Sequence, residues 1–206
     1  MDLFEYAKSR TMENESPLAS RLRPTKLEEV VGQQHIVGKD KLLYRAIKAD
    51  KLTSVIFYGP PGTGKTTLAK VIANTTSADF TQINATVAGK KDMEEVVKQA
   101  QNALGMYGRK TILFIDEIHR FNKSQQDSLL HAVEKGWIVL IGATTENPSF
   151  EVVSALLSRS QVYVLKSLSY EKLDELAELS LKKYNEKEQT EFKIKDKEAF
   201  IQYSGG

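Results

Sequence analysis

Residues 59–66 read Gly59-Pro60-Pro61-Gly62-Thr63-Gly64-Lys65-Thr66, and this stretch decides the fold. It matches the phosphate-loop pattern G-x-x-x-x-G-K-[S/T] at every fixed position. The glycines let backbone N–H groups turn inward around phosphate oxygens, since no Cβ stands in the way. Lys65 adds a positive charge and Thr66 a hydroxyl suited to Mg²⁺. We expect these residues, with Thr67 directly after them, to bind the phosphates of a nucleotide.

The segments on either side of this loop read as a strand and a helix, which is the context that a phosphate-binding loop needs. Val55-Ile56-Phe57-Tyr58 is a short apolar run typical of a strand buried on both faces, and residues 66–74 read as a helix. Further strands are expected at 80–83, 111–115, 138–142 and 162–165, with helices at 93–104, 124–134 and 151–157 between them. This alternation predicts an α/β fold of the P-loop NTPase type, with a five-stranded parallel sheet and helices on both faces.

The pattern changes after the fifth strand. Ser169 is a plausible N-cap, and the apolar residues from Leu173 to Tyr184 then follow one face of a long helix. Asp196 is placed to cap another helix, and no further strand follows. We therefore expect a flexible N-terminal arm at 1–16, an αβα core at 17–167 and the beginning of a helical lid at 168–206.

The composition of the chain excludes several classes of function. The 206 residues include no cysteine, which rules out disulfides, thiolate nucleophiles and Cys-ligated zinc. No apolar run is long enough to span a bilayer, and Asp2 and Glu5 interrupt any signal peptide. We expect a cytoplasmic protein that does not bind membranes. The net charge of +2 is too small to indicate nucleic-acid binding by itself.

A second cluster of functional residues follows the predicted strand at 111–115. Asp116 and Glu117 stand at the carboxyl end of that strand, which is the edge of a parallel sheet where ligands bind. Asp116 is placed to hold Mg²⁺ together with Thr66. Glu117 is placed to orient and deprotonate an attacking water. Together with the phosphate loop, this pair predicts hydrolysis of a nucleoside triphosphate.

With both motifs on alternating β/α units, the chain resembles an AAA+ ATPase. The resemblance implies ATP and Mg²⁺ as cofactors and gives roles to further residues. Asn84 matches the polar switch residue that holds the catalytic glutamate, and Thr145 matches sensor 1 at the end of the fourth strand. Arg159 resembles the arginine finger that acts in trans on a neighbouring subunit. Val31 and Gly32 match the loop around adenine.

Within AAA+, the chain is similar to the replication-associated recombination protein A family, as the N-terminal ATPase part of such a protein. The stretches that carry the resemblance are 16–24, 31–35, 56–62, 116–123 and 142–150. The family implies a DNA-dependent ATPase of the bacterial cytoplasm and nucleoid, acting at stalled replication forks and on recombination intermediates. It also implies a homo-oligomer, typically a tetramer, and binding to single-stranded-DNA-binding protein. The family's sensor 2 arginine lies beyond Gly206, so only weak ATPase activity is expected of this chain alone.

Two other classes of function stay open on the sequence. A clamp-loader subunit or a RuvB-like branch-migration motor has the same ATPase motifs, and a non-hydrolysing scaffold also binds nucleotide. Arg120 and Lys123, just before the helix at 124–134, are candidate DNA contacts, with a solvated helix start as the equal alternative. The three histidines, His35, His119 and His131, lack metal-ligand spacing, so a packing or capping role is expected for them.

Overall fold

The computed structural model describes residues 21–203, so the predicted arm at 1–16 lies outside the described residues. The chain divides into two compact units. The larger one spans Thr25–Leu168, and the described part of the smaller one consists of residues 21–24 and 169–203.

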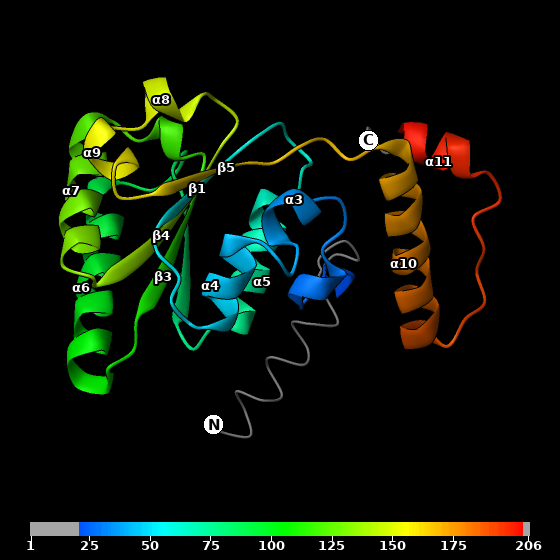
Figure 1. Ribbon diagram of the computed structural model, residues 1–206, viewed down its shortest axis with the longest axis horizontal. Coiled ribbons are helices and arrows are strands. Elements are labelled where there is room, and N and C mark those ends of the chain that lie inside the picture. The colour runs from blue at the N-terminus through cyan, green and yellow to red at the C-terminus, as the bar shows by residue number, and fades with distance from the viewer. Residues whose placement is uncertain (1–20, 204–206) are drawn as a thin grey trace. The chain divides into compact units, whose positions relative to one another are not determined.

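Five parallel strands form the centre of the larger unit, in the order β2-β3-β4-β1-β5 (Figure 1). They are β1 (Val55–Tyr58), β2 (Asp79–Asn84), β3 (Thr111–Asp116), β4 (Ile138–Thr144) and β5 (Gln161–Val164). β1 lies between β4 and β5 and pairs with both in parallel. The predicted five-stranded parallel sheet is therefore confirmed.

The apolar runs of the sequence bury alternate residues on the two faces of this sheet. In β1, Val55 and Phe57 pack on one face and Ile56 on the other, and all three side chains are fully buried. β3 repeats the pattern, with Ile112 and Phe114 opposite Leu113 and Ile115. Because successive strand residues point to opposite faces, a continuous apolar run supplies two cores at once.

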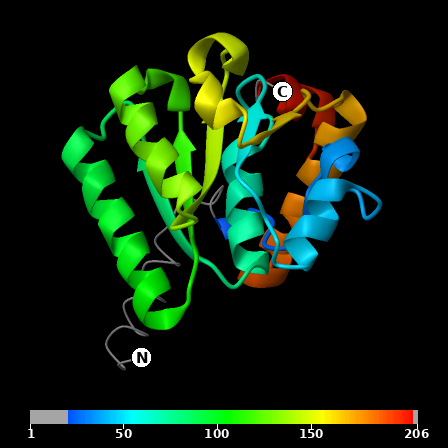
Figure 2. The same cartoon turned by 60° about the vertical axis from the view of Figure 1, so that its left-hand side comes forward.

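Helices cover both faces of the sheet (Figure 2). On one face lie the 3₁₀ turn η1 (Leu27–Glu29) and the helices α3 (Gln34–Val37), α4 (Leu42–Lys48) and α5 (Lys65–Thr75). On the other lie α6 (Lys90–Tyr107), η2 (Ile118–Arg120) and α7 (Lys123–Glu134). The helix after β1 thus packs on one face and the helices after β2 and β3 on the other. In parallel sheets, ligands bind at the carboxyl ends of the strands where such a change of side occurs.

The prediction of a single short helix at 151–157 is wrong, because the structure has two short helices in this region. They are α8 (Pro148–Glu151) and α9 (Ser154–Leu157). The buried side chain of Gln126 in α7 donates to the Glu151 carbonyl oxygen at 2.9 Å and accepts from the Val153 N–H at 2.9 Å. These two backbone groups are therefore not free to continue the helix between α8 and α9.

The described part of the smaller unit is helical. It contains α10 (Tyr170–Glu188) and α11 (Lys197–Tyr203). Asp196 caps α11 as predicted, since its carboxylate accepts from the Ala199 N–H at 3.0 Å. Lys197 forms ion pairs with two acidic residues of α10, Asp174 at 3.2 Å and Glu178 at 2.6 Å. Within residues 21–203, no helix has the length and hydrophobicity that crossing a bilayer requires.

Candidate functional site

The phosphate loop joins β1 to α5 at the carboxyl edge of the sheet. Gly62 and Gly64 have φ angles of 77° and 90°, which are left-handed conformations that favour glycine. Gly64 is the N-cap of α5, so the free N–H groups of the first helical turn and the positive end of the helix dipole face the loop. Thr63 closes the loop, because its hydroxyl donates to the Pro60 carbonyl oxygen at 2.9 Å. This is the geometry of an anion site at a helix N-terminus.

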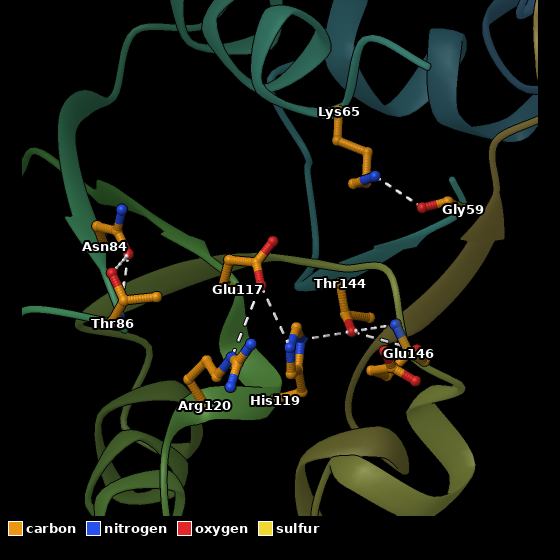
Figure 3. A network of polar contacts seen from close by, with 9 residues as sticks. All are labelled: Gly59, Lys65, Asn84, Thr86, Glu117, His119, Arg120, Thr144 and Glu146. Atoms are coloured by element: carbon orange, nitrogen blue, oxygen red, sulfur yellow. Dashed lines mark hydrogen bonds and ion pairs between the residues drawn. The ribbon is translucent and has the colours of Figure 1, made fainter. Parts of the chain in front are cut away.

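Lys65 is the first residue of α5, and its side chain folds back over the loop. The ammonium donates to the Gly59 carbonyl oxygen at 2.7 Å and to that of Pro60 at 2.8 Å (Figure 3). Burial lowers the pKa of Lys65, and the charges of Asp116 and Glu117 act against that shift. A phosphate oxygen would compete with the two carbonyls for this ammonium group.

Thr66 and Asp116 are brought together from two different motifs. The Thr66 hydroxyl donates to Asp116 Oδ2 at 3.4 Å, although β4 separates the strands that precede the two residues. Both side chains offer hard oxygen ligands, which are the ones that Mg²⁺ prefers. The pair therefore fits a magnesium ion shared with nucleotide phosphates.

Glu117 follows Asp116 in a strained backbone conformation. Its φ and ψ angles of 58° and 42° are left-handed, which is uncommon for a residue with a Cβ. This conformation ends β3 and starts the 3₁₀ turn η2. Glu117 Oε2 lies 3.2 Å from His119 Nε2 and 3.9 Å from Arg120 Nε. The side chain is 34% exposed, so one end of the carboxylate is held and the group stays within reach of water.

Asn84 ends β2 beside Asp116, its partner in the register of the sheet. Its side-chain oxygen accepts from the Thr86 N–H at 2.9 Å and from the Thr86 hydroxyl at 2.7 Å. Among the described residues, the hydrogen-bonding partner of Asn84 Oδ1 is thus Thr86, and Figure 3 draws no interaction between Asn84 and Glu117. The structure does not bring Asn84 and Glu117 into contact.

Thr145 lies directly after β4 and is half-buried, whereas Thr144, the last residue of the strand, is buried. The Thr144 hydroxyl lies 3.0 Å from His119 Nδ1 and accepts from the Glu146 N–H at 3.0 Å. The structure therefore places Thr144, which the sequence pattern passed over, in the same network as Glu117 (Figure 3).

The predicted adenine loop is held to the phosphate loop by Gln33. Val31 and Gly32 are half-buried, and Gly32 has a φ angle of 84°. The Gln33 side chain, 1% exposed, donates to the Thr63 carbonyl oxygen at 3.2 Å and to the Lys166 carbonyl oxygen at 2.8 Å. It also accepts from the Lys166 N–H at 3.2 Å. One buried amide thus connects the adenine loop, the phosphate loop and the segment after β5.

Arg159 lies after α9, and its contacts are outside the phosphate loop. Its guanidinium pairs with Glu134 of α7 at 2.7 Å and donates to the Ala155 carbonyl oxygen at 3.0 Å. The side chain is 43% exposed. Arg159 is therefore displayed on the surface of the larger unit, where a second molecule can reach it.

Arg120 and Lys123 flank the start of α7. Asn122 caps this helix through a capping box with Gln125, and Lys123 is the first helical residue. Arg120 has a side chain that is 63% exposed and shares the turn η2 with His119. Both basic residues are thus exposed, and Arg120 lies next to the Glu117 carboxylate.

Gln33 and Thr144 escaped the sequence analysis, and His119 was expected only to pack or to cap. The sequence held one signal for His119, because a side chain two residues after Glu117 in a tight turn can return to the same carboxylate. Gln33 and Thr144 act through contacts with distant parts of the chain, which no local pattern indicates.

Residues 55–168 match the model of the ATPase family associated with various cellular activities (AAA). The chain is 59% identical over 153 residues to replication-associated recombination protein A of Coxiella burnetii, covering 74% of this chain and 34% of the relative. It is 55% identical over 160 residues to the protein of that name from Escherichia coli K12, covering 78% and 36%. The chain thus spans about a third of the length of these curated relatives.

Among solved structures, the chain is similar to the Thermotoga maritima RuvB Holliday junction branch migration motor. The TM-score is 0.67 at 32% identity, over 80% of this chain and 55% of that one. The family match covers the strands and both motifs that form the candidate site. The chain therefore belongs to the AAA family of ATPases, and within it resembles replication-associated recombination protein A.

Proposed function

We propose that this chain binds and hydrolyses Mg-ATP as the ATPase part of a DNA-dependent enzyme that acts at stalled replication forks and on recombination intermediates. The observation that carries the chemistry is the meeting of two motifs at one edge of the sheet. Thr66 of the phosphate loop lies 3.4 Å from Asp116, and the Glu117 carboxylate follows directly. A scaffold that binds nucleotide without hydrolysing it needs no such carboxylate.

Each part of the site has a role in the proposed reaction. The phosphate loop, from Gly59 to Thr67, binds the phosphates, and Val31 and Gly32 line the adenine. Thr66 and Asp116 hold Mg²⁺, which when bound supplies positive charge against the phosphate oxygens. Glu117 accepts the proton of the attacking water, Lys65 stabilises charge that develops on the phosphates, and Asn84 and Thr145 orient the reacting groups.

The proposed role of Arg159 needs a second subunit. An arginine finger stabilises the transition state of phosphoryl transfer from outside the nucleotide site. Arg159 is exposed, and its guanidinium contacts Glu134 and the Ala155 carbonyl oxygen instead of the phosphate loop, which supports action in trans. Assembly of the complete protein into a homo-oligomer, a tetramer in the resembled family, belongs to the same proposal.

The proposed work on DNA is supported by the relatives. The curated relatives are named for replication and recombination, and the similar solved structure for migration of a Holliday junction. Arg120 and Lys123 are the proposed DNA contacts, because both are basic and lie beside the catalytic turn. Binding to single-stranded-DNA-binding protein and a cytoplasmic, nucleoid-associated location follow from the resemblance. A RuvB-like branch-migration motor is the second candidate, favoured by the likeness to the RuvB structure.

The test is the ATPase rate of the complete protein at one fixed salt concentration, since phosphate contacts depend strongly on salt. The rate is measured without DNA, with single strands, with plain duplex and with a single-strand/double-strand junction. We expect the junction to stimulate hydrolysis most. Equal rates under all four conditions would contradict the DNA-dependent role. A mobile Holliday junction that stimulates more than the simple junction would favour the branch-migration motor.

The DNA contact is tested with a matched pair of lysines at the two ends of α7. Lys123→Gln removes a charge at the start of the helix, and Lys135→Gln removes one directly after its end. We expect Lys123→Gln to raise the DNA concentration that gives half-maximal stimulation, while Lys135→Gln leaves it unchanged. If both variants raise this DNA concentration equally, the stimulation depends only on the net charge of the protein and not on a contact at Lys123.

A further inference from the structure

A continuous chain of polar contacts links Glu117 to the end of β4 through His119 (Figure 3). His119 Nε2 lies 3.2 Å from Glu117 Oε2, and His119 Nδ1 lies 3.0 Å from the Thr144 hydroxyl. The Thr144 oxygen in turn accepts from the Glu146 N–H at 3.0 Å. The His119 side chain is 8% exposed, so these contacts are shielded from most competing water.

The hydrogen-bonding capacity of the groups fixes the direction of the bond between His119 and Glu117. An ionised Glu117 carboxylate only accepts, so His119 Nε2 donates to Glu117 Oε2. The Thr144 hydroxyl has one proton and also lies 3.1 Å from the Glu146 carbonyl oxygen, so it either donates to Nδ1 or accepts from an Nδ1–H while it donates to that carbonyl. Both arrangements leave the two ring nitrogens hydrogen-bonded. The imidazole ring is thereby held at both ends.

The contact leaves one Glu117 oxygen free for catalysis. His119 and Arg120 both approach Oε2. In Figure 3 the other oxygen points away from His119, toward the side of the view where Lys65 lies. A carboxylate anchored by one oxygen presents the second in a fixed direction, which is what a general base requires.

We propose that His119 is a positioning residue for Glu117, and that it ties the orientation of this base to the end of β4 through Thr144. The proposal rests on the proposed ATPase function. Thr144 directly precedes Thr145, the residue proposed to contact the γ-phosphate or the attacking water. A shift of the end of β4 would therefore change the position of the Glu117 carboxylate through the side chains of Thr144 and His119. Asn84, bonded to Thr86, does not contact the base in this structure.

The experiment compares His119→Leu with His119→Gln in the complete protein, by single-turnover ATP hydrolysis and by calorimetric binding of ATP. Leucine removes the donor to Glu117, so we expect hydrolysis to fall about 10-fold or more with unchanged ATP affinity, since small misplacement of a catalytic group is costly. Glutamine keeps an N–H donor, and we expect it to recover part of the rate. His131→Leu is the matched control, because His131 is exposed on α7 and packs against Trp137. We expect it to leave the rate unchanged.

A second pair of variants avoids replacing the buried ring. Thr144→Val removes the hydroxyl that fixes Nδ1, and Thr144→Ser keeps it. We expect valine to lower the hydrolysis rate in the same direction as His119→Leu, and serine to retain most of it. If serine and valine lower the rate equally, Thr144 acts through packing, and the link to β4 is overturned.

A double-mutant cycle separates positioning from a general structural role. If His119 acts through Glu117, then His119→Leu has no further effect on the residual hydrolysis of the Glu117→Gln variant. Independent effects of the two changes, or a loss of ATP affinity in His119→Leu, would overturn the proposal. If the unmodified protein hydrolyses ATP and Glu117→Gln does not, yet His119→Leu keeps the full rate, only the role of His119 is lost. Absence of hydrolysis in the unmodified protein would remove the proposed function as well.

Discussion

Glu117 shows at the scale of one residue how the backbone serves the proposed chemistry. Its left-handed conformation, with φ at 58°, ends β3 abruptly and lets the next three residues form η2. That turn brings His119 and Arg120 back to the Glu117 carboxylate. A conformation of this kind costs about 1–3 kcal/mol, and it persists because the buried neighbour Ile118 fixes the turn in the core.

Gly142 of β4 makes room for this turn, and replacing it should disturb the site. A Cβ at position 142 would lie 2.7 Å from Ile56 Cδ1 and 3.0 Å from Ile118 Cδ1, and both side chains are fully buried. We expect Gly142→Ala to destabilise the protein by about 1–3 kcal/mol, as overpacking does. We also expect it to lower the ATPase rate, because Ile118 directly follows Glu117.

The measurement for Gly142→Ala is urea denaturation, with Gly105→Ala as the matched control. Gly105 lies within α6, where an added Cβ would meet nothing within 4 Å. There we expect a gain in stability of about 0.5–1 kcal/mol, since glycine weakens a helix interior. A Gly142→Ala protein as stable as the original would show that the core around Ile118 adapts freely.

At the scale of elements, Gln33 holds three segments in place with one side chain. Gln33→Leu has a similar volume but leaves the Thr63 carbonyl oxygen and both backbone groups of Lys166 without this partner. We expect a loss of about 1–3 kcal/mol for each group that stays buried without a hydrogen bond. ATP affinity should fall as well, because Thr63 belongs to the phosphate loop. Urea denaturation and calorimetry measure the two effects.

The neighbouring Gln34 is the control for this prediction. Gln34 is exposed, and its side chain makes one hydrogen bond, to the Val30 carbonyl oxygen at 3.0 Å. We expect Gln34→Leu to cost about 1 kcal/mol or less and to leave ATP affinity unchanged. Equal losses for the two variants would mean that Gln33 does not connect the loops.

Elements with strong local patterns could be predicted from the sequence, and elements shaped by distant contacts could not. β1 begins and ends where its apolar run does, and the phosphate loop starts the helix α5 that follows. The break between α8 and α9 depends on Gln126, a residue of another helix. The contacts of His119 with Thr144 and of Gln33 with Lys166 likewise join residues far apart in the chain.

At the scale of the whole molecule, Arg159 connects the proposed reaction to assembly. We predict that Arg159→Ala leaves ATP affinity unchanged and lowers hydrolysis by about 10³-fold under conditions where the unmodified protein is assembled, the usual contribution of an arginine finger. The measurement is the rate per subunit as a function of protein concentration. The rate of the unmodified protein should rise with concentration and that of the variant should stay low.

Arg109→Ala is the control for Arg159. Arg109 lies two residues before β3, at the amino ends of the strands, and its contact with Asp79 is long at 3.6 Å. We expect this variant to behave like the unmodified protein. If Arg159→Ala lowers the rate by the same factor at every protein concentration, Arg159 acts within its own subunit.

The assignment of Glu117 as the general base is tested most directly by one measurement, single-turnover hydrolysis of saturating Mg-ATP by the complete protein and by its Glu117→Gln variant. The substitution keeps the size of the side chain and removes its ability to accept a proton. We predict unchanged ATP affinity and hydrolysis slower by at least about 10²-fold, the usual effect of losing a general base. Hydrolysis at a near-normal rate in Glu117→Gln would contradict the assignment.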